Sequence, residues 1–369
     1  MVFARKYRPK CLEDVIGQPV VVKTITNALV KNRLHHAYLF GGNLGSGKTT
    51  TARVLAASEN CKVSPGLKPC GQCSVCVGIF EGSHVDVLEI DAASNAGKVE
   101  QIRELKNSAS YRPVDGAKSK YFIIDEFHRC GLSSSEALLK LIEEPPPSVR
   151  FVLCTTEINN IRPTILSRCQ SHEFKKIYWR EISEYLHKVT KLENIETDLD
   201  SLHLCSKLSG GSVRNALQNL QKVVDFCDNK ITIDDTQKAL GAVSDVVFYD
   251  LLDQVIGNGN SPDATKGYRI INELLSLGIG FDVIYGSIAD SLRNILIGIT
   301  ASSCVDLIMV SDEGKKRLID QLKKCKTKIN CVVEVIKNLV EMKTSVEYGL
   351  SPELALQTWL IGSIFIFNK

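Results

Sequence analysis

The sequence lacks the features that mark secreted and membrane-spanning proteins. In its 369 residues no apolar run approaches the ~20 residues that cross a bilayer, and the opening MVFARKYRPK is basic, without the apolar core of a signal peptide. The nearest candidate, the final LALQTWLIGSIFIFNK, is short and contains Gln357, Thr358 and Ser363. A buried terminal helix is the better interpretation, and a tail anchor is the alternative. We expect a cytoplasmic protein with no membrane partner.

Internal repeats and low-complexity tracts are also lacking, which excludes solenoids and disordered tails. Without a secretory signal, the 13 cysteines are expected to be thiols or metal ligands rather than disulfides. Residues 1–180 carry 25 Lys and Arg against 17 Asp and Glu, whereas residues 181–369 carry 20 against 25. This asymmetry is consistent with a front half that meets a polyanion, and equally with an ordinary solvated surface.

Residues 1–180 alternate short apolar runs with helical patterns. The runs are continuous, as in strands buried on both faces, and lie at 36–40, 85–90, 121–125 and 151–156. Intervening segments such as TTTARVLAAS and SSSEALLKLIEE have helical spacing, so we predict a parallel α/β sheet.

Strand signals fade from Trp179 onward. SGGS at 209–212 starts a helix within a small helical domain. After a break near 241–246, helical patterns follow at 247–256, 264–277, 281–299, 313–342 and 351–367.

A phosphate-binding loop stands between the first strand and its helix. GGNLGSGKTT has the pattern G-x-x-x-x-G-K-[ST] at Gly42, Gly47, Lys48 and Thr49. Its glycines let backbone N–H groups converge on phosphate oxygens at the amino end of a helix. Lys48 is expected to reach the β- and γ-phosphates, and the Thr49 hydroxyl to ligate Mg²⁺.

Two further strand ends supply polar groups beside this loop. In YFIIDEFH, Asp125 reaches the carboxyl edge of the sheet, where it can hold Mg²⁺, and Glu126 is placed to orient or deprotonate a water. Together with the phosphate loop this pair predicts an ATPase site. In FVLCTTE, a hydroxyl of Thr155 or Thr156 contacts the γ-phosphate or the water, or else caps the following turn.

Four cysteines lie in CKVSPGLKPCGQCSVC, at positions 61, 70, 73 and 76. Four thiolates with two C-x-x-C turns suit tetrahedral Zn²⁺ and leave no open position for catalysis, so a structural clip is predicted. An iron–sulfur cluster is the alternative. Arg214 lies in the first turn of a predicted helix, where the helix dipole disfavours a cation. An external anion bound by Arg214 would explain its position, and a solvated arginine is the other interpretation.

These motifs together resemble the gamma/tau subunit family of the bacterial DNA polymerase III clamp loader, which are AAA+ ATPases. ARKYRPKCLEDVIGQ, HHAYLFGG, EIDAASN, IIDEFH, LLKLIEEPP, TILSRC and GGSVRNAL are similar to that family's blocks over roughly residues 4–241. The resemblance implies an AAA+ ATPase domain at 1–178 with a zinc module at about 61–76. It also implies a helical lid at 179–242 and an all-helical collar for oligomerisation at 243–369.

The resemblance also assigns roles to residues. Arg168 matches an arginine finger that reaches the γ-phosphate on a neighbouring subunit, Arg214 the second sensor and Thr156 the first. The remaining catalytic positions are Lys48, Asp125 and Glu126. The residues that would bind ATP are Tyr7, Arg8, Pro9, Val15, Ile16, Gly42, Gly45, Ser46, Gly47, Lys48, Thr49, Thr50 and Arg214.

By the same resemblance, ATP-bound subunits open a sliding clamp on primer–template DNA, and hydrolysis releases it. The implied partners are copies of this chain with stator and wrench-type subunits in a ring of five, the clamp and the DNA. Expected phosphate contacts are Lys98, Arg103, Arg129, Ser133 and Lys140. Phe127 and Arg129 in DEFHRCG, and an extra residue in ASNAGKVEQ, depart from the family pattern.

Three other classes fit parts of the sequence. A branch-migration helicase shares the phosphate loop and the acidic pair, but the zinc insertion and the SRC block argue against it. A stator-type clamp-loader subunit that has lost hydrolysis, or a zinc-dependent DNA-binding module with a vestigial nucleotide site, would lack a complete phosphate loop.

Overall fold

The computed structural model describes residues 2–64, 66, 68–94, 100–114, 116–227, 230–257, 263–301, 308, 310 and 312–367, and excludes the side chains of 100–104, 132–133 and 312–313. These residues form two compact units, Met1–Thr236 and Gln237–Lys369. The predicted boundary between lid and collar, 242/243, lies a few residues beyond this division, which α11 (Ile233–Leu240) spans. The division into three domains stays a prediction.

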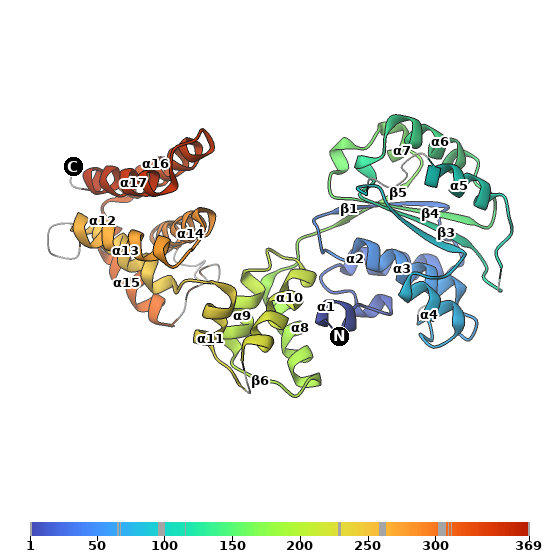
Figure 1. Ribbon diagram of the computed structural model, residues 1–369, viewed down its shortest axis with the longest axis horizontal. Coiled ribbons are helices and arrows are strands. Elements are labelled where there is room, and N and C mark those ends of the chain that lie inside the picture. Colours follow the sequence, from blue (N-terminus) through green and yellow to red (C-terminus); the bar gives the residue numbers. More distant parts are fainter. Residues whose placement is uncertain are drawn as a thin grey trace. The chain divides into compact units, whose positions relative to one another are not determined.

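A parallel five-stranded sheet forms the centre of the first unit, as predicted (Figure 1). Its order is β2-β3-β4-β1-β5, with strands β1 (Ala37–Gly42), β2 (Val87–Asp91), β3 (Lys120–Asp125), β4 (Val149–Thr155) and β5 (Gln170–Phe174). The four predicted apolar runs are β1 to β4. The edge strand β5 was not predicted, because QSHEF is short and mostly polar.

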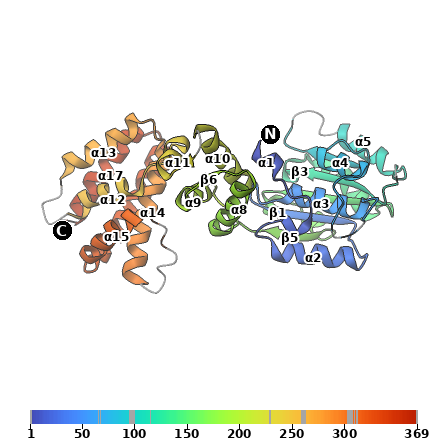
Figure 2. The same ribbon diagram turned by 90° about the horizontal axis from the view of Figure 1, so that it is seen from below.

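Helices cover both faces of this sheet (Figures 1 and 2). One layer holds α2 (Pro19–Val30), α3 (Lys48–Asn60) and α4 (Ser74–Glu81), and the other holds α5 (Glu100–Ala109), α6 (Leu132–Glu143) and α7 (Pro163–Leu166). Successive residues of a strand enter opposite layers: Phe40 packs with the first set of helices and Leu39 with the second. Burial on both faces explains why the strands read as continuous apolar runs.

The first unit also contains four short helices. They are α1 (Phe3–Lys6) and the 3₁₀ turns η1 (Leu12–Asp14), η2 (Phe127–Arg129) and η3 (Ile158–Asn160).

The region predicted to form the lid, called the lid below, belongs to the first unit and contains α8 (Trp179–Leu192), α9 (Leu199–Lys207) and α10 (Val213–Phe226), with a small parallel pair β6 (Glu196–Thr197) and β7 (Lys230–Ile231). The predicted helix start at SGGS is the amino end of α10, where the Ser212 hydroxyl accepts a hydrogen bond from the Asn215 N–H at 3.2 Å. Helix α1 packs against α10, and the Phe3 N–H donates to Gln221 Oε1 at 3.1 Å. The amino-terminal segment is therefore anchored on the lid.

All the regular secondary structure in the described residues of the second unit is helical. Its helices are α12 (Asp245–Ile256), α13 (Ala264–Ser276), α14 (Phe281–Thr300), α15 (Asp312–Cys325), α16 (Ile329–Glu347) and α17 (Pro352–Phe367), and they share one hydrophobic core that includes Trp359. The single pattern predicted at 313–342 was wrong, because the chain turns at 326–328 and forms two helices. Cys325 and Val332 lie on either side of the turn and both enter the core, so helical spacing continues across it.

Within the described part of the chain, no helix is both long enough and apolar enough to traverse a lipid bilayer.

Candidate functional site

The phosphate loop runs from the end of β1 to the start of α3. Gly47 precedes α3 with a φ of 102°, a conformation that glycine adopts without the steric cost of a Cβ. The Lys48 side chain is buried, and its Nζ donates to the carbonyl oxygens of Gly42 at 2.7 Å and Asn43 at 2.9 Å. Burial lowers the pKa of Lys48 below its ordinary value. The ammonium group is therefore held over the hollow of the loop.

The same loop lies directly against the lid. Gly45 has a φ of 73°, and a Cβ at this position would be 2.0 Å from Ser212 Oγ and 3.4 Å from Arg214 Cβ. Only glycine permits this approach of the loop to the start of α10.

An acidic pair follows β3 beside the loop. Thr49 Oγ1 donates to Asp125 Oδ2 at 2.6 Å, so the hydroxyl and the carboxylate already converge on one point. These are oxygen ligands of the type that Mg²⁺ prefers, and the pair fits the predicted metal position. Glu126 adopts a φ of 48° at the start of η2, in the left-handed region that is costly for a residue with a side chain.

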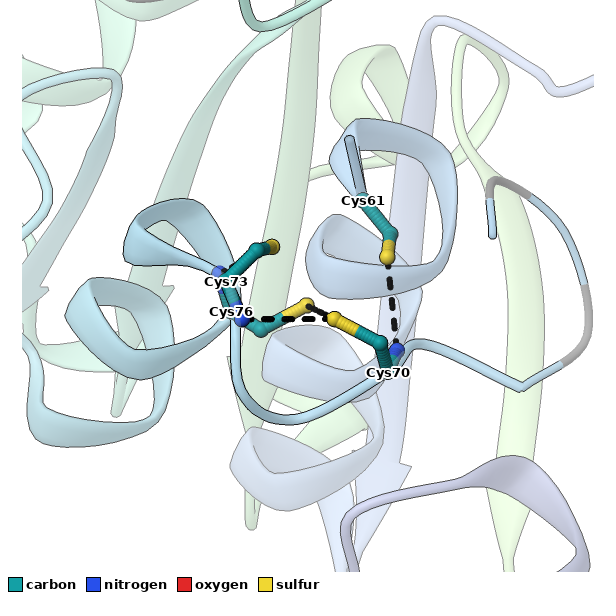
Figure 3. Close-up of side chains that lie close together, drawn as sticks. All are labelled: Cys61, Cys70, Cys73 and Cys76. Carbon is teal, nitrogen blue, oxygen red and sulfur yellow. Dashed lines mark hydrogen bonds between the residues drawn. The ribbon is translucent and has the colours of Figure 1, made fainter. Parts of the chain in front are cut away.

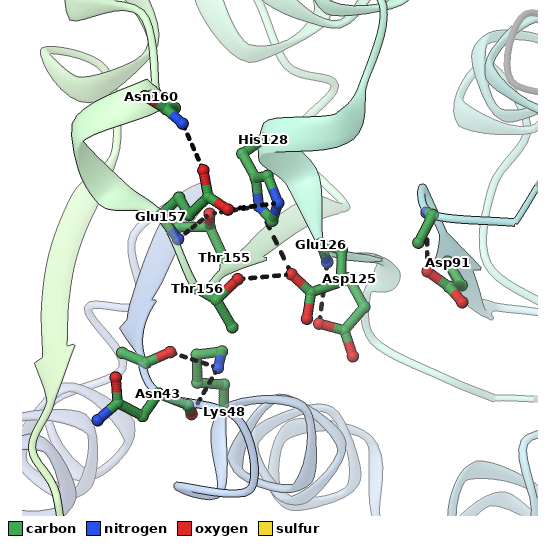
Figure 4. Close-up of polar contacts among 12 residues, drawn as sticks. Asn43, Lys48, Asp91, Asp125, Glu126, His128, Thr155, Thr156, Glu157 and Asn160 are labelled. Atoms are coloured by element: carbon green, nitrogen blue, oxygen red, sulfur yellow. Dashed lines mark hydrogen bonds and ion pairs between the residues drawn. The ribbon is translucent and has the colours of Figure 1, made fainter. Parts of the chain in front are cut away.

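The end of β4 lies between these two groups, because β4 separates β1 from β3. Thr156 Oγ1 donates to Glu126 Oε2 at 2.9 Å (Figure 4). Thr155 is buried, and its hydroxyl accepts from the Glu157 N–H at 3.0 Å, which is the capping role that the sequence left open. Of the two threonines, Thr156 is the one that contacts the acidic pair.

One cleft connects the loop, the acidic pair and the lid. The predicted residues that line it are Tyr7, Arg8, Pro9, Val15, Ile16, Gly45, Ser46, Gly47, Lys48, Thr49, Thr50, Asp125, Glu126 and Arg214. Gly42, Thr156 and Arg168, also predicted, do not line it. The cleft is also lined by six residues that were not predicted, which are Ala4, Leu44, Ile177, Tyr185, Val213 and Leu217.

The lining residues that were not predicted belong to no sequence motif that would mark them as part of a site. Val213 adjoins the predicted Arg214, but Ile177 and Tyr185 are apolar or aromatic positions of a kind found in any core. Tyr185 supports the cleft by donating its hydroxyl to the Tyr7 carbonyl oxygen at 2.8 Å. Only packing brings it to the site.

The amino-terminal wall of the cleft is tied to α8. The Tyr7 hydroxyl donates to Glu193 just beyond that helix, and Lys6 forms an ion pair with the same carboxylate. Burial and the Glu193 carboxylate raise the pKa of Tyr7 to about 12, and the hydrogen bonds from Lys6 and Tyr7 lower the pKa of Glu193.

Arg168 lies outside the cleft, just after α7. Its guanidinium is part exposed, forms an ion pair with Glu143 at 2.7 Å and donates to the Thr164 carbonyl oxygen at 2.8 Å. Arg214, by contrast, is in the first turn of α10 and faces the cleft. The two predicted arginines therefore belong to different surfaces of the first unit.

The four cysteines of the insertion come together between α3 and α4 (Figure 3). Their sulfur atoms all lie within 4.8 Å of one another, and four sulfurs at ~2.3 Å from a zinc ion would be about 3.8 Å apart. Backbone N–H groups of Ser64 and Cys70 donate to Cys61 Sγ at 3.3 Å. Burial raises the pKa of Cys73, but donated hydrogen bonds outweigh it and lower the pKa to about 6, which favours the metal-binding thiolate. The cluster fits a structural zinc ion.

The predicted DNA contacts are only partly described. Lys98 lies outside the described residues, as do the side chains of Arg103 and Ser133. Arg129 and Lys140 are both exposed. Phe127, the departure from the family pattern, is buried in the core beneath η2.

The first unit has a parallel sheet with a phosphate loop after β1, an acidic pair after β3 and threonine hydroxyls at the end of β4 between them, and the helices of the lid lie beside the loop. These features define a P-loop ATPase of the AAA+ class. The family described as DNA polymerase III, delta subunit, matches residues 17–178. The chain is 34% identical to DNA polymerase III subunit gamma of Buchnera aphidicola subsp. Acyrthosiphon pisum, over 96% of this chain and 97% of that protein. It belongs to the gamma/tau subunit family, which confirms the resemblance.

Other relatives are longer than this chain. DNA polymerase III subunit tau of Bacillus subtilis is 38% identical over 74% of this chain, but the match spans only 48% of that protein. A solved structure of the Thermotoga maritima RuvB Holliday junction branch migration motor matches at a TM-score of 0.48 and 20% identity, over 74% of this chain and 86% of that one. A similarity at that level does not favour a branch-migration motor.

Proposed function

We propose that this chain is an ATP-hydrolysing motor subunit of a DNA polymerase sliding-clamp loader. ATP binding would open the clamp on primer–template DNA, and hydrolysis would release it. The observation that carries the ATPase part is the 2.6 Å hydrogen bond between Thr49 and Asp125, since it joins the phosphate loop to the acidic strand end at the point where Mg²⁺–ATP is bound in P-loop enzymes. Membership of the gamma/tau family supports the clamp-loader part.

Different residues of the cleft would bind different parts of the nucleotide. Tyr7, Arg8 and Pro9, with Val15 and Ile16, would hold the adenine end. The backbone N–H groups of Gly45 to Thr50 would hold the phosphates, with Lys48 on the β- and γ-phosphates. Thr49 and Asp125 would hold Mg²⁺, which neutralises charge on the phosphates when bound.

The hydrolytic water would be oriented by Glu126. One oxygen of its carboxylate accepts from Thr156, and Glu126 itself lines the cleft, so the other oxygen is available to a water. Arg214 would reach the γ-phosphate from the lid of the same subunit.

Arg168 would complete the site of a neighbouring subunit. Its exposure and its position outside its own cleft support an action in trans. An arginine finger of this kind is worth ~10³–10⁵ in rate, because it meets charge that grows in the transition state. Hydrolysis would then depend on assembly.

The remaining parts would serve assembly and DNA binding. The cysteine cluster would bind a structural Zn²⁺. The second unit would form the collar, and the partners would be stator and wrench-type subunits with further copies of this chain in a ring of five. Arg129 and Lys140, and also Lys98, Arg103 and Ser133, would contact DNA phosphates, so sequence preference should be slight. The protein would act in the cytoplasm.

Steady-state ATP hydrolysis, measured with and without the clamp and primed DNA, tests this proposal. A loader is stimulated by clamp and primed DNA together, and Lys48→Ala abolishes the activity. Turnover stimulated by unprimed duplex without the clamp would indicate a branch-migration motor instead. A wild-type chain that joins the loader but never hydrolyses ATP would indicate a stator-type subunit.

A further inference from the structure

The His128 side chain is buried beside the acidic pair, and the proposed mechanism gives it no role. It lies on η2, two residues after Glu126, and only 7% of its side chain is exposed. Its Nδ1 is 3.0 Å from Thr155 Oγ1 and 3.5 Å from Glu126 Oε2, and its Nε2 is 3.6 Å from Glu157 Oε1 (Figure 4). Whichever ring nitrogen carries the proton therefore faces a carboxylate.

Both ends of this arrangement are fixed to the sheet. Thr155 is the last residue of β4, and its hydroxyl also accepts from the Glu157 N–H. The Glu157 carboxylate accepts in turn from Asn160 on η3. On the other side, Phe127 anchors η2 in the core. The imidazole thus bridges the ends of β3 and β4.

The same Glu126 oxygen that accepts from Thr156 is the one that His128 approaches. Glu126 also has the unfavourable φ of 48°, a conformation that persists only where surrounding contacts hold the residue. Two groups on one oxygen fix the rotation of the carboxylate and direct its second oxygen elsewhere. A general base displaced by ~1 Å loses much of its effect.

We propose that His128 is a positioning residue for hydrolysis, which holds the Glu126 carboxylate through Nδ1 and is itself held by Thr155 and Glu157. This inference rests on the proposed function, because it assigns to Glu126 the orientation of the water. His128 acts through Glu126, so its loss should lower turnover without weakening ATP binding.

A double-mutant comparison separates this role from a structural one. In single-turnover ATP hydrolysis by the full chain with clamp and primed DNA, His128→Ala should lower the rate about tenfold and change ATP affinity less than twofold. In a Glu126→Gln background, where the base is already lost, His128→Ala should lower the rate no further. An equal tenfold loss in both backgrounds would overturn the inference.

Two conservative variants locate the contact that matters. The amide of His128→Asn occupies the place of Nδ1 and should retain most of the rate. The amide of His128→Gln occupies the place of Nε2, which faces Glu157, and should resemble His128→Ala. The reverse order would refute the assignment to Glu126.

His172 provides a matched control. It is also buried, on β5, where it packs against Tyr38 and Phe40, and no hydrogen bond to its Nε2 is present among the described residues. His172→Phe should leave the rate unchanged, and a comparable loss would mean that the assay reports core packing. If the wild-type chain hydrolyses no ATP, the proposed function fails. If it does and the two backgrounds respond equally, only the role of His128 fails.

Discussion

Replacing Gly45 by alanine tests whether the lid and the phosphate loop form one nucleotide site. The new Cβ would lie 2.0 Å from Ser212 Oγ, at a backbone φ of 73°. The left-handed conformation costs a non-glycine residue ~1–2 kcal/mol. Ser212 would have to leave its hydrogen bond with the Asn215 N–H, and the loss of such a helix cap costs ~1 kcal/mol. The two effects together amount to ~2–3 kcal/mol.

Gly210 offers a matched control on the lid side. Its φ is 63°, yet a Cβ there would meet no atom within 4 Å, so Gly210→Ala incurs the conformational cost alone. In urea unfolding of the full chain, Gly45→Ala should be more destabilised than Gly210→Ala by about 1 kcal/mol. In titrations with Mg²⁺–ATP, Gly45→Ala should bind about fivefold more weakly, since the clash costs about 1 kcal/mol and 1.4 kcal/mol corresponds to a factor of ten, and Gly210→Ala should bind normally.

A second substitution tests whether the contact with Ser212 is the reason for the effect of Gly45→Ala. Ser212→Ala removes the nearest atom, so it should be less harmful in the Gly45→Ala background than in the wild-type chain. If Gly45→Ala binds ATP as tightly as the wild type and is no less stable than Gly210→Ala, the loop does not depend on the lid and the reasoning is refuted.

Three further predictions concern other parts of the first unit. Arg168→Ala should leave ATP binding nearly intact and suppress turnover of the assembled ring by at least ~10³-fold; equal loss of binding and turnover in isolated subunits would contradict this. The wild-type chain should contain one zinc ion by elemental analysis. It should melt at a lower temperature when a chelator is present, because a structural zinc site contributes to the free energy of folding. Cys73→Ser should lose the metal, whereas Cys205→Ser, at a buried cysteine of the lid, should keep it. The pKa of Glu193 is lower in the folded chain than its unfolded value of ~4.3, so the ionised carboxylate stabilises the fold above that pH. This stabilisation is lost as the pH falls through the folded pKa. Glu193→Gln should therefore unfold more easily than the wild type at pH 6, and the difference in stability should shrink steadily as the pH falls below ~4.3. A difference that does not shrink would exclude this ion pair as the cause.

The parts of the site that the sequence predicted are local in the chain. The glycines and Lys48 form one loop with one backbone conformation, and Asp125 follows a continuous apolar strand. The cysteines have short spacings that suit one ion. In each case the chemistry depends on neighbours within a few residues, so the pattern survives in the linear sequence.

The parts that were missed depend on the packing of distant segments. Tyr185 joins the cleft because α8 packs beside the amino-terminal segment. Thr155 and Thr156 are adjacent in the sequence, and only the packing of the strand ends shows that the Thr156 hydroxyl contacts Glu126 while the Thr155 hydroxyl contacts His128. The turn at 326–328 continues the helical spacing, and only the packing of two helices on one core reveals it.

By itself the sequence determined the class of site: a phosphate loop, an acidic strand end and a four-thiolate clip, each encoded by residues close together in the chain. Only the tertiary structure decided which oxygen of Glu126 is held, that His128 bridges two strand ends, and that Gly45 meets Ser212. Those facts depend on the order of the strands and the packing of the lid, because contacts between residues tens of positions apart leave no spacing in the sequence to read.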